Sequence, residues 1–336
     1  MSKRYFLPIF LVFQIIFLQI LKHFPEFVER FYSNGLYIYI SRISRIVFGK
    51  IPFSVGDCIY GILILLILRW FFRVRKSWRT NYKDNILKIL SYISVFYFLF
   101  HILWAFNYYR KPLFEKMKIE REYSDADLID FTEKLILKTN EIQFQITKND
   151  SAKVVFPYSQ SQAFAMNLNG YDKLSNEYKC FNYNYLSVKK SIFSLPLTYM
   201  GFGGYLNPFT NEAQVNDLLP MYNFPSTTCH EMAHQLGYAS EIECNFIGFL
   251  ATIKNDNLYY KYSGYCMALQ YCLNNLGAKN PETAKALLKT IHKGILENYK
   301  ENDEIYLKYH SFIDDGFEIF YDHFLKMNQQ KDGFNS

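Results

Sequence analysis

Three long apolar runs in the first third of the chain limit most strongly what it can fold into. They cover about residues 5–22, 55–72 and 86–106. Each is close to the roughly 20 residues that an α-helix needs to cross a hydrocarbon core. Lys3 and Arg4 precede the first run, as in a signal peptide, but no cleavage site of small residues follows it. The sequence therefore predicts a membrane anchor over residues 1–106, with three transmembrane helices and the lipid bilayer as a partner.

The distribution of lysine and arginine predicts how these helices are oriented. The loop between the second and third runs, together with its flanks, is the most densely basic one. Loops of this kind stay on the cytoplasmic side of a membrane. Three crossings then place everything after Phe106 on the extracytoplasmic side. The basic residues of this loop and its flanks are Arg69, Arg73, Arg75, Lys76, Arg79 and Lys83.

Net charge and cysteine spacing argue against two further classes of protein. The formal net charge is +6, and much of it lies next to the apolar runs. The chain has no basic motif with interleaved aromatic residues, so we expect no nucleic acid as a partner. The cysteines form no CxxC pair, which argues against a zinc site built from cysteine, while a disulfide after residue 106 stays open. The cysteines are Cys58, Cys180, Cys229, Cys244, Cys266 and Cys272.

Residues 107–336 show the pattern of a globular domain. We predict one mostly helical domain with a small sheet, so the chain as a whole belongs to the α+β class with mostly α structure. Residues 191–202 are the best strand candidate, and residues 211–216 are predicted as a polar edge strand. A helix over residues 159–178 is predicted to be interrupted near Asn167. Further helices are predicted over residues 226–236, 240–253, 258–276, 282–298 and 304–327.

The segment His230-Glu231-Met232-Ala233-His234 carries the clearest chemistry. Residues i and i+4 lie on one face of an α-helix, so His230 and His234 are able to bind one metal ion. Glu231 lies on a neighbouring part of that face, where it reaches a metal-bound water without being a ligand. Two neutral ligands, an adjacent base and an open coordination position are what zinc hydrolysis needs. The ordinary alternative is a solvent-facing helix with two histidines; it is less favoured, because Gly237 also suits the helix end.

A zinc hydrolase needs a third protein ligand, and two glutamates after this segment are candidates. Ser240 is a natural N-cap for the next helix, and Glu243 at the third helical position also completes a capping box. Glu241 and Asn245 lie one helical turn apart on a polar face that is able to meet the zinc. We predict Glu241 as the third ligand ahead of Glu243, and Asn245 as the partner of a ligand histidine.

Two resemblances follow from these residues. Glu241-x-x-Cys244-Asn245 is similar to the Glu-x-x-Ala/Ser-Asp/Asn pattern of gluzincin peptidases, in which that glutamate is the third zinc ligand. The chain also resembles a bacterial family of membrane proteins, domain of unknown function 3810, in its three membrane segments and in four stretches of sequence. The stretches are FNYYRKP at 106–112, PFTNEAQVN at 208–216, HEMAHQLGYASEIECNF at 230–246 and YDHFLKMN at 321–328.

The resemblance implies a zincin-like metallopeptidase domain anchored in a bacterial cytoplasmic membrane, with Zn²⁺ as cofactor and a peptide or protein as substrate. It implies that Glu231 takes a proton from the zinc-bound water and returns it to the leaving amine. We favour Tyr321 as the donor to the oxyanion. The edge strand predicted at residues 211–216 offers a place for an extended peptide. Less favoured oxyanion donors are His292, His310 and His323.

Two other functions are alternatives to peptide hydrolysis. A catalytically silent zinc-binding domain, serving interaction or sensing, is disfavoured by Glu231, because a structural site needs no base. A transport function is disfavoured because the apolar runs carry almost no charge. The sequence stops at Ser336, where we would expect a little more helix if the chain were complete.

Overall fold

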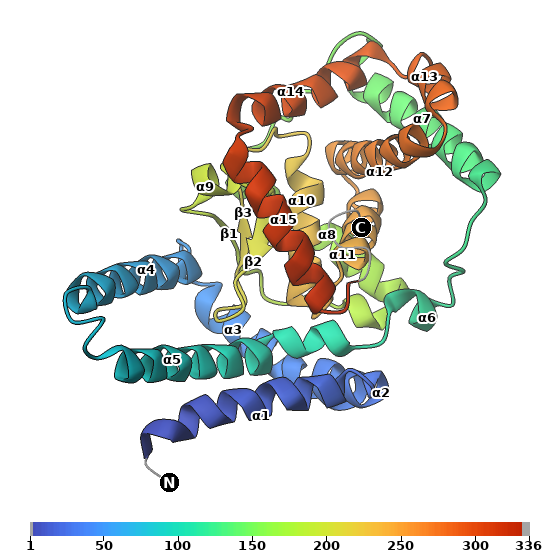
Figure 1. The fold of residues 1–336 in the computed structure, drawn as a ribbon. Helices are drawn as coiled ribbons and strands as arrows, with labels where there is room; N and C mark the ends of the chain where they lie inside the picture. Colours follow the sequence, from blue (N-terminus) through green and yellow to red (C-terminus); the bar gives the residue numbers. More distant parts are fainter. Residues whose placement is uncertain (1–2, 331–336) are drawn as a thin grey trace.

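The computed structural model describes residues 3–330 and is mostly helical (Figure 1). Among these residues, three helices are long and apolar enough to cross a membrane, as the sequence predicted. The first span joins a short 3-10 turn, η1 (Lys3–Tyr5), to helix α1. These candidate membrane spans, called the spanning helices below, are α1 (Phe6–Leu21), α4 (Val55–Val74) and α5 (Tyr82–Leu103).

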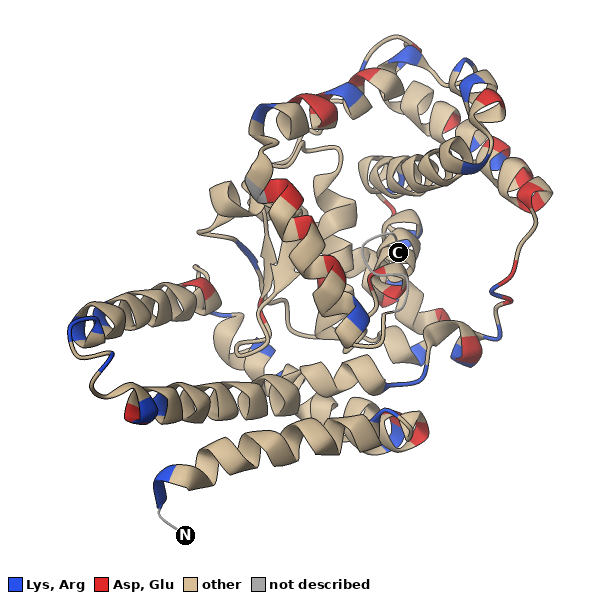
Figure 2. Cartoon of the chain, in the orientation of Figure 1, with Lys and Arg blue, Asp and Glu red and all other residues tan. Residues whose placement is uncertain are grey.

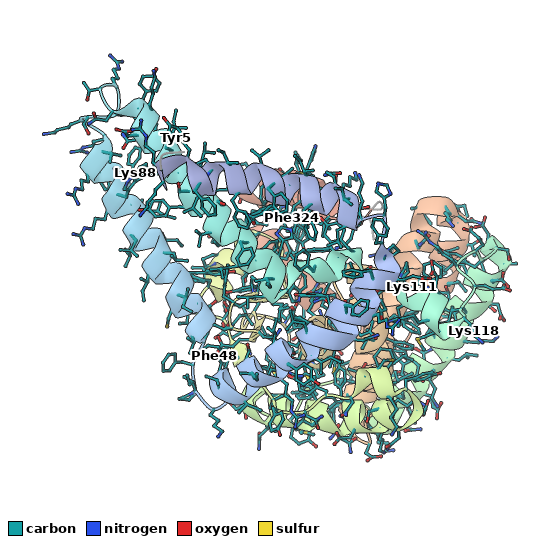
Figure 3. The ribbon with its side chains drawn as sticks, turned by 90° about the horizontal axis from the view of Figure 1, so that it is seen from below. Tyr5, Phe48, Lys88, Lys111, Lys118 and Phe324 are labelled. Atoms are coloured by element: carbon teal, nitrogen blue, oxygen red, sulfur yellow. The ribbon has the colours of Figure 1, made fainter. Side chains whose placement is uncertain are left out.

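Lysine and arginine gather at one end of these helices (Figure 2). Helix α1 packs along α5, and Arg4 lies 3.5 Å from Asp84 at their shared N-terminal end. Figure 3 shows Tyr5 and Lys88 near this end, with Phe48 and Lys111 toward the opposite one. The turn between α4 and α5 carries its basic residues at the same end.

The stretch between the first two spans is helical rather than an extended loop. It consists of α2 (Pro25–Phe27), a π-helical segment η2 (Val28–Leu36) and α3 (Tyr37–Phe48). Its buried residues form a shared core with α1, with the 3-10 turn η3 (Ala105–Tyr109) and with Ala239 of the following domain. The spanning helices and the domain are therefore packed together at this end.

Two further cores hold the rest of the chain. One lies between the sheet and helices α8, α10 and α11, and the other between α7, α12, α13 and α14. Capping boxes at Ser124 and Ser159 begin α7 and α8. The helices are α6 (Leu113–Met117), α7 (Asp125–Thr147), α8 (Gln160–Glu177), α9 (Ser194–Tyr199), α10 (Phe224–Gln235), α11 (Glu241–Lys254), α12 (Leu258–Lys279), α13 (Pro281–Leu288), α14 (Lys293–Tyr309) and α15 (Phe312–Met327), with a 3-10 turn η4 (Lys179–Phe181).

The sheet in the described residues has three short strands in the order β1-β3-β2: β1 (Val188–Lys190), β3 (Ala213–Val215) and β2 (Gly204–Leu206). Strand β1 pairs with β3 in parallel, and β2 pairs with β3 in antiparallel. The prediction of an edge strand at residues 211–216 is wrong, since β3 is the central strand. Both edges of β3 are paired, so only β1 and β2 have a free edge.

The prediction of a strand over residues 191–202 is also wrong, because half of this range forms α9 and the rest has turn or irregular structure. The Ser191 hydroxyl accepts a hydrogen bond from the amide of Phe193, and Ser194 donates to the carbonyl of Ser191. These bonds end the strand and begin the helix. The apolar alternation was misleading because Ile192 and Leu195 are exposed rather than buried in the core.

Three of the predicted helices also differ from those in the structure. Helix α8 continues through Asn167, whose side chain donates back to the carbonyl of Ala163. The predicted helices 282–298 and 304–327 are divided differently, into α13, α14 and α15. The break before α14 is stabilised by Asn140, which donates to the Thr290 carbonyl and accepts from the amide of His292. The predicted continuation of helix at the chain end lies outside the described residues.

A buried ion pair joins the membrane-proximal segment to the domain. The Arg110 guanidinium donates two hydrogen bonds of 2.9 Å to Glu29 and one of 2.7 Å to the carbonyl of Gly237. Lys116 also lies 2.9 Å from Glu29. Burial opposes ionisation of Glu29, but Arg110 and Lys116 hold its pKa at about 2. The stabilisation from this lowered pKa is present above the unfolded value of about 4.3 and is lost as the pH falls toward 2.

We expect Glu29→Gln to lower the free energy of unfolding by about 3–5 kcal/mol, because it leaves the buried Arg110 without its counter-charge. The measurement is chemical unfolding of the full chain in detergent. Asp130→Asn is the matched control, since Asp130 pairs with Lys134 on the surface, and such a pair contributes at most about 1 kcal/mol. Equal effects of the two substitutions would contradict a structural role of the Glu29–Arg110 pair.

Candidate metal centre

Helix α10 carries the His-Glu-x-x-His segment and ends immediately after it. Gly237 has φ of +86°, as we predicted for a glycine at the helix end. A side chain there would also collide with the ring of Tyr37, since a Cβ atom would lie 2.8 Å from it. The chain therefore turns sharply after α10 and enters α11 only a few residues later. This turn brings the first residue of α11 back toward the two histidines.

Three predicted side chains come together at this turn. The Nε2 atom of His230 lies 3.1 Å from Oε2 of Glu241, and the Nε2 atom of His234 lies 3.6 Å from the same oxygen. One donor atom from each of the three residues lies within 4.8 Å of the others. Ligands bound tetrahedrally to zinc at about 2.0–2.1 Å are separated by about 3.3 Å. The two distances to Glu241 are close to that separation, so these three residues could hold a metal ion.

Each of the two imidazoles has its other nitrogen, Nδ1, beside an oxygen acceptor. The Nδ1 of His230 lies 2.7 Å from Oδ1 of Asn245, and that of His234 lies 2.8 Å from the carbonyl of Tyr238. The predicted contact between Asn245 and a site histidine is confirmed. An acceptor at Nδ1 favours the proton there, which leaves the lone pair on Nε2. Two lone pairs and a carboxylate then converge on one point, an arrangement that a cation stabilises.

The second oxygen of Glu241 is also held. Oε1 accepts a hydrogen bond of 2.8 Å from the hydroxyl of Tyr321, which comes from α15. Although burial opposes ionisation of Glu241, the charge of a protonated His234 and hydrogen bonds donated by the imidazoles hold its pKa well below its usual range. The carboxylate is therefore charged, with one oxygen oriented by Tyr321 and the other directed at the histidines. The neutral imidazoles, with the lone pair on Nε2, are the form that binds a cation.

Glu243, the less favoured candidate for third ligand, lies elsewhere. Its carboxylate accepts a hydrogen bond from the amide of Leu113, and burial raises its pKa. It does not form the capping box either, because Ser240 makes no side-chain hydrogen bond at the start of α11. Cys244 is buried, with its sulfur 3.2 Å from Nδ1 of His234, on the side of the ring away from the converging donors.

Glu231 lies beside the three converging residues and is 4% exposed. A Cβ atom at Gly204 would lie 2.8 Å from both Cγ and Oε1 of Glu231, so only glycine in β2 leaves room for this side chain. Its Oε2 has no hydrogen-bond partner among the described residues. Burial raises the pKa of Glu231 to about 7. A general base works best with a pKa near the operating pH.

Tyr321 is the one predicted oxyanion donor that reaches this cluster. Helix α15 crosses in front of α10 and α11 (Figure 1), and the Tyr321 ring contacts Phe202 at 4.8 Å between centroids. The three histidine candidates bond to groups elsewhere. His292 lies beside Gln143, His310 beside Asp314, and His323 beside the carbonyl of Ile319.

Sequence reasoning missed the residues that hold the end of α10. The carbonyl of His234 accepts hydrogen bonds from Trp104 at 3.3 Å and Tyr37 at 3.4 Å, and the carbonyl of Gln235 accepts one from Ser41 at 2.7 Å. These donors come from α3 and from the residue that follows α5. No local pattern marks them, because each acts through a contact with a distant part of the chain. The one available signal was general: the last four carbonyls of any helix lack partners within the helix and therefore need donors.

A comparison with protein families agrees with the resemblance to domain of unknown function 3810. The family "Protein of unknown function (DUF3810)" matches residues 32–336. The searches of curated proteins and of solved structures found no match. The match begins in the segment that precedes α3 and continues through the His-Glu-x-x-His helix to the end of the chain. The chain belongs to the DUF3810 family.

Proposed function

We propose that this protein is a membrane-anchored zinc metallopeptidase. The observation that carries the proposal is the convergence of His230, His234 and Glu241 within 4.8 Å, with Glu231 beside them. Two imidazole nitrogens and one carboxylate oxygen are a donor set that zinc takes in hydrolytic sites, with one position left for water. Asn245 and Tyr238 orient the two imidazoles, as partners of zinc-bound histidines do.

The residues of the site have distinct roles in peptide-bond hydrolysis. A bound zinc ion supplies Lewis acidity and lowers the pKa of a coordinated water to about 7. With zinc held by His230, His234 and Glu241, the Oε2 of Glu231, which has no partner among the described residues, would accept a proton from the attacking water, and Glu231 would deliver it to the nitrogen of the leaving amine. Burial raises the pKa of Glu231 to about 7, so this carboxylate is suited to both transfers. Tyr321 keeps one oxygen of Glu241 oriented.

Strand β2 offers the place for an extended substrate. It lies at one edge of the sheet, and its first residue, Gly204, contacts Glu231. A peptide that pairs with a free strand edge uses its backbone amides and carbonyls and needs no particular side chains. β2 replaces residues 211–216 in this role. A sheet edge beside a helix with two metal-binding histidines supports the zincin-like domain that the resemblance implies.

We expect substitution of any of the three ligands to remove the metal. His230→Ala and Glu241→Ala chains should retain less than about a tenth of the zinc bound by the wild type, because the loss of one ligand weakens a three-residue site severely. Glu243→Gln is the matched control, since Glu243 lies in the same helix but outside the cluster. Zinc is measured by elemental analysis of the purified full chain. Loss of zinc in Glu243→Gln alone would contradict the assignment.

Glu231→Gln should keep the metal and lose hydrolysis by about 10²–10⁴-fold, since general acid–base catalysis contributes about this much. Cleavage is measured by mass spectrometry of new termini, with unstructured polypeptides presented both in solution and on the bilayer that holds the enzyme. If both the wild type and the Glu231→Gln variant bind zinc and neither cleaves, the alternative of a zinc-binding interaction or sensor domain is favoured. The burial of His234, which is 6% exposed, is the observation that favours that alternative.

Tyr321→Phe separates two roles of the tyrosine. Its hydroxyl bonds to Glu241, so we expect the substitution to weaken zinc affinity by about 10–100-fold, as loss of partners of metal ligands does. Competition with a chelator measures the affinity. If zinc affinity is unchanged and only the turnover rate falls, Tyr321 acts on the reacting groups instead, as first predicted.

A further inference from the structure

The candidate metal centre lies directly against the end of a spanning helix. Trp104 follows Leu103, the last residue of α5. Its Nε1 atom donates a hydrogen bond of 3.3 Å to the carbonyl of His234, and its ring centroid lies 6.1 Å from that of the His234 imidazole. One side chain therefore separates α5 from a residue of the site. Tryptophan at the end of a spanning helix is typical of the membrane–water interface.

A second spanning helix is attached to the sheet behind the site. Asp57, in the first turn of α4, is buried and accepts hydrogen bonds from the hydroxyl of Tyr205 in β2 and, at 2.6 Å, from the amide of Ile192 after β1. Glu212, next to β3, accepts from the amides of Val55 and Gly56, the first two residues of α4. The sheet is thus fixed to the N-terminal end of α4, while Gly204 of the same sheet contacts Glu231.

The connection between β2 and β3 reaches between the two spanning helices (Figure 1). The ring of Phe209 in this connection lies 6.2 Å from that of Tyr60 in α4 and 5.1 Å from that of Phe96 in α5. Phe96 precedes the last residue of α5 by seven positions. With a rise of 1.5 Å per residue, the contact lies about 10 Å along α5 from that end. The connection between β2 and β3 therefore packs against α4 and α5 inside their apolar length, not only at their ends.

These three attachments hold the site and the sheet against the ends of the spanning helices α4 and α5. We propose that the substrate is a membrane-tethered polypeptide, cleaved close to the point where it leaves the bilayer. This inference rests on the proposed peptidase function. A chain that emerges beside α5 reaches the site after at most about ten extended residues, which span roughly 35 Å. Tethering also raises the effective concentration of such a chain at the site.

The test compares one unstructured sequence in two forms, with the wild-type full chain reconstituted in vesicles. In the first form the sequence follows a single spanning helix in the same vesicle, and in the second it is free in solution. We expect new termini within about ten residues of the span, and cleavage at least about tenfold faster than in solution. Glycine–serine spacers of roughly 10, 20 and 40 residues should slow cleavage step by step, because the effective concentration of the sequence at the site falls as a flexible spacer lengthens.

A second readout does not depend on hydrolysis. The Glu231→Gln chain is mixed in vesicles with the tethered sequence, which carries a photo-crosslinking residue at different distances from its span. We expect cross-links to the enzyme to be strongest within about ten residues of the span and to weaken beyond that. Mass spectrometry locates them, and the prediction places them near β2 and α10.

The outcomes separate this inference from the function on which it rests. Cleavage of the soluble form as fast as the tethered form, or cross-links equal at all distances, would overturn the inference and leave the peptidase function standing. Cross-links confined to positions near the span, with no cleavage of either form by the wild type, would overturn the peptidase function. That result would support recognition of membrane-tethered chains by the site.

Discussion

The carbonyl groups at the end of α10 are the groups on which the rest of the structure depends. A helix leaves its last carbonyls without partners inside the helix, and buried carbonyls need donors. Here the donors are Tyr37 and Ser41 from α3, Trp104 at the end of α5, and Arg110, which bonds to Gly237 just beyond the helix. The membrane-proximal segments therefore hold the helix of the site in place. We expect the domain after residue 106 to depend on the segments before it.

The turn between α10 and α11 also determines how the two histidine rings are oriented. It places the Tyr238 carbonyl at Nδ1 of His234, while α11 places Asn245 at Nδ1 of His230. Both rings then present Nε2 to one oxygen of Glu241. The helix and the loop after it thus act as one unit, since a shift of the turn would change the tautomer that each ring favours as well as its position. Glu231 does not belong to this set, and its Oε2 lies beside it without a hydrogen-bond partner in the part of the chain that the structure describes.

The sequence was sufficient for features that depend on local spacing. The spanning helices follow from the length of apolar runs, and the grouping of His230, His234 and Glu241 follows from helix geometry and a short turn. Features that depend on tertiary contacts were missed or misassigned. The strand predicted at residues 191–202 failed because its apolar alternation reflects exposed side chains. The edge-strand prediction at residues 211–216 failed because strand order is set by pairing between distant segments, which polarity alone does not reveal.

The most direct test of the account is X-ray absorption spectroscopy at the zinc edge of the purified full chain. The account predicts about one zinc ion per chain, with nitrogen and oxygen neighbours at about 2.0–2.1 Å and a signal from imidazole rings. Cys244 lies close enough to His234 to offer a sulfur ligand if the site were arranged differently. A sulfur neighbour at about 2.3 Å, or a folded chain that binds no zinc, would contradict the assignment of His230, His234 and Glu241 as the metal ligands.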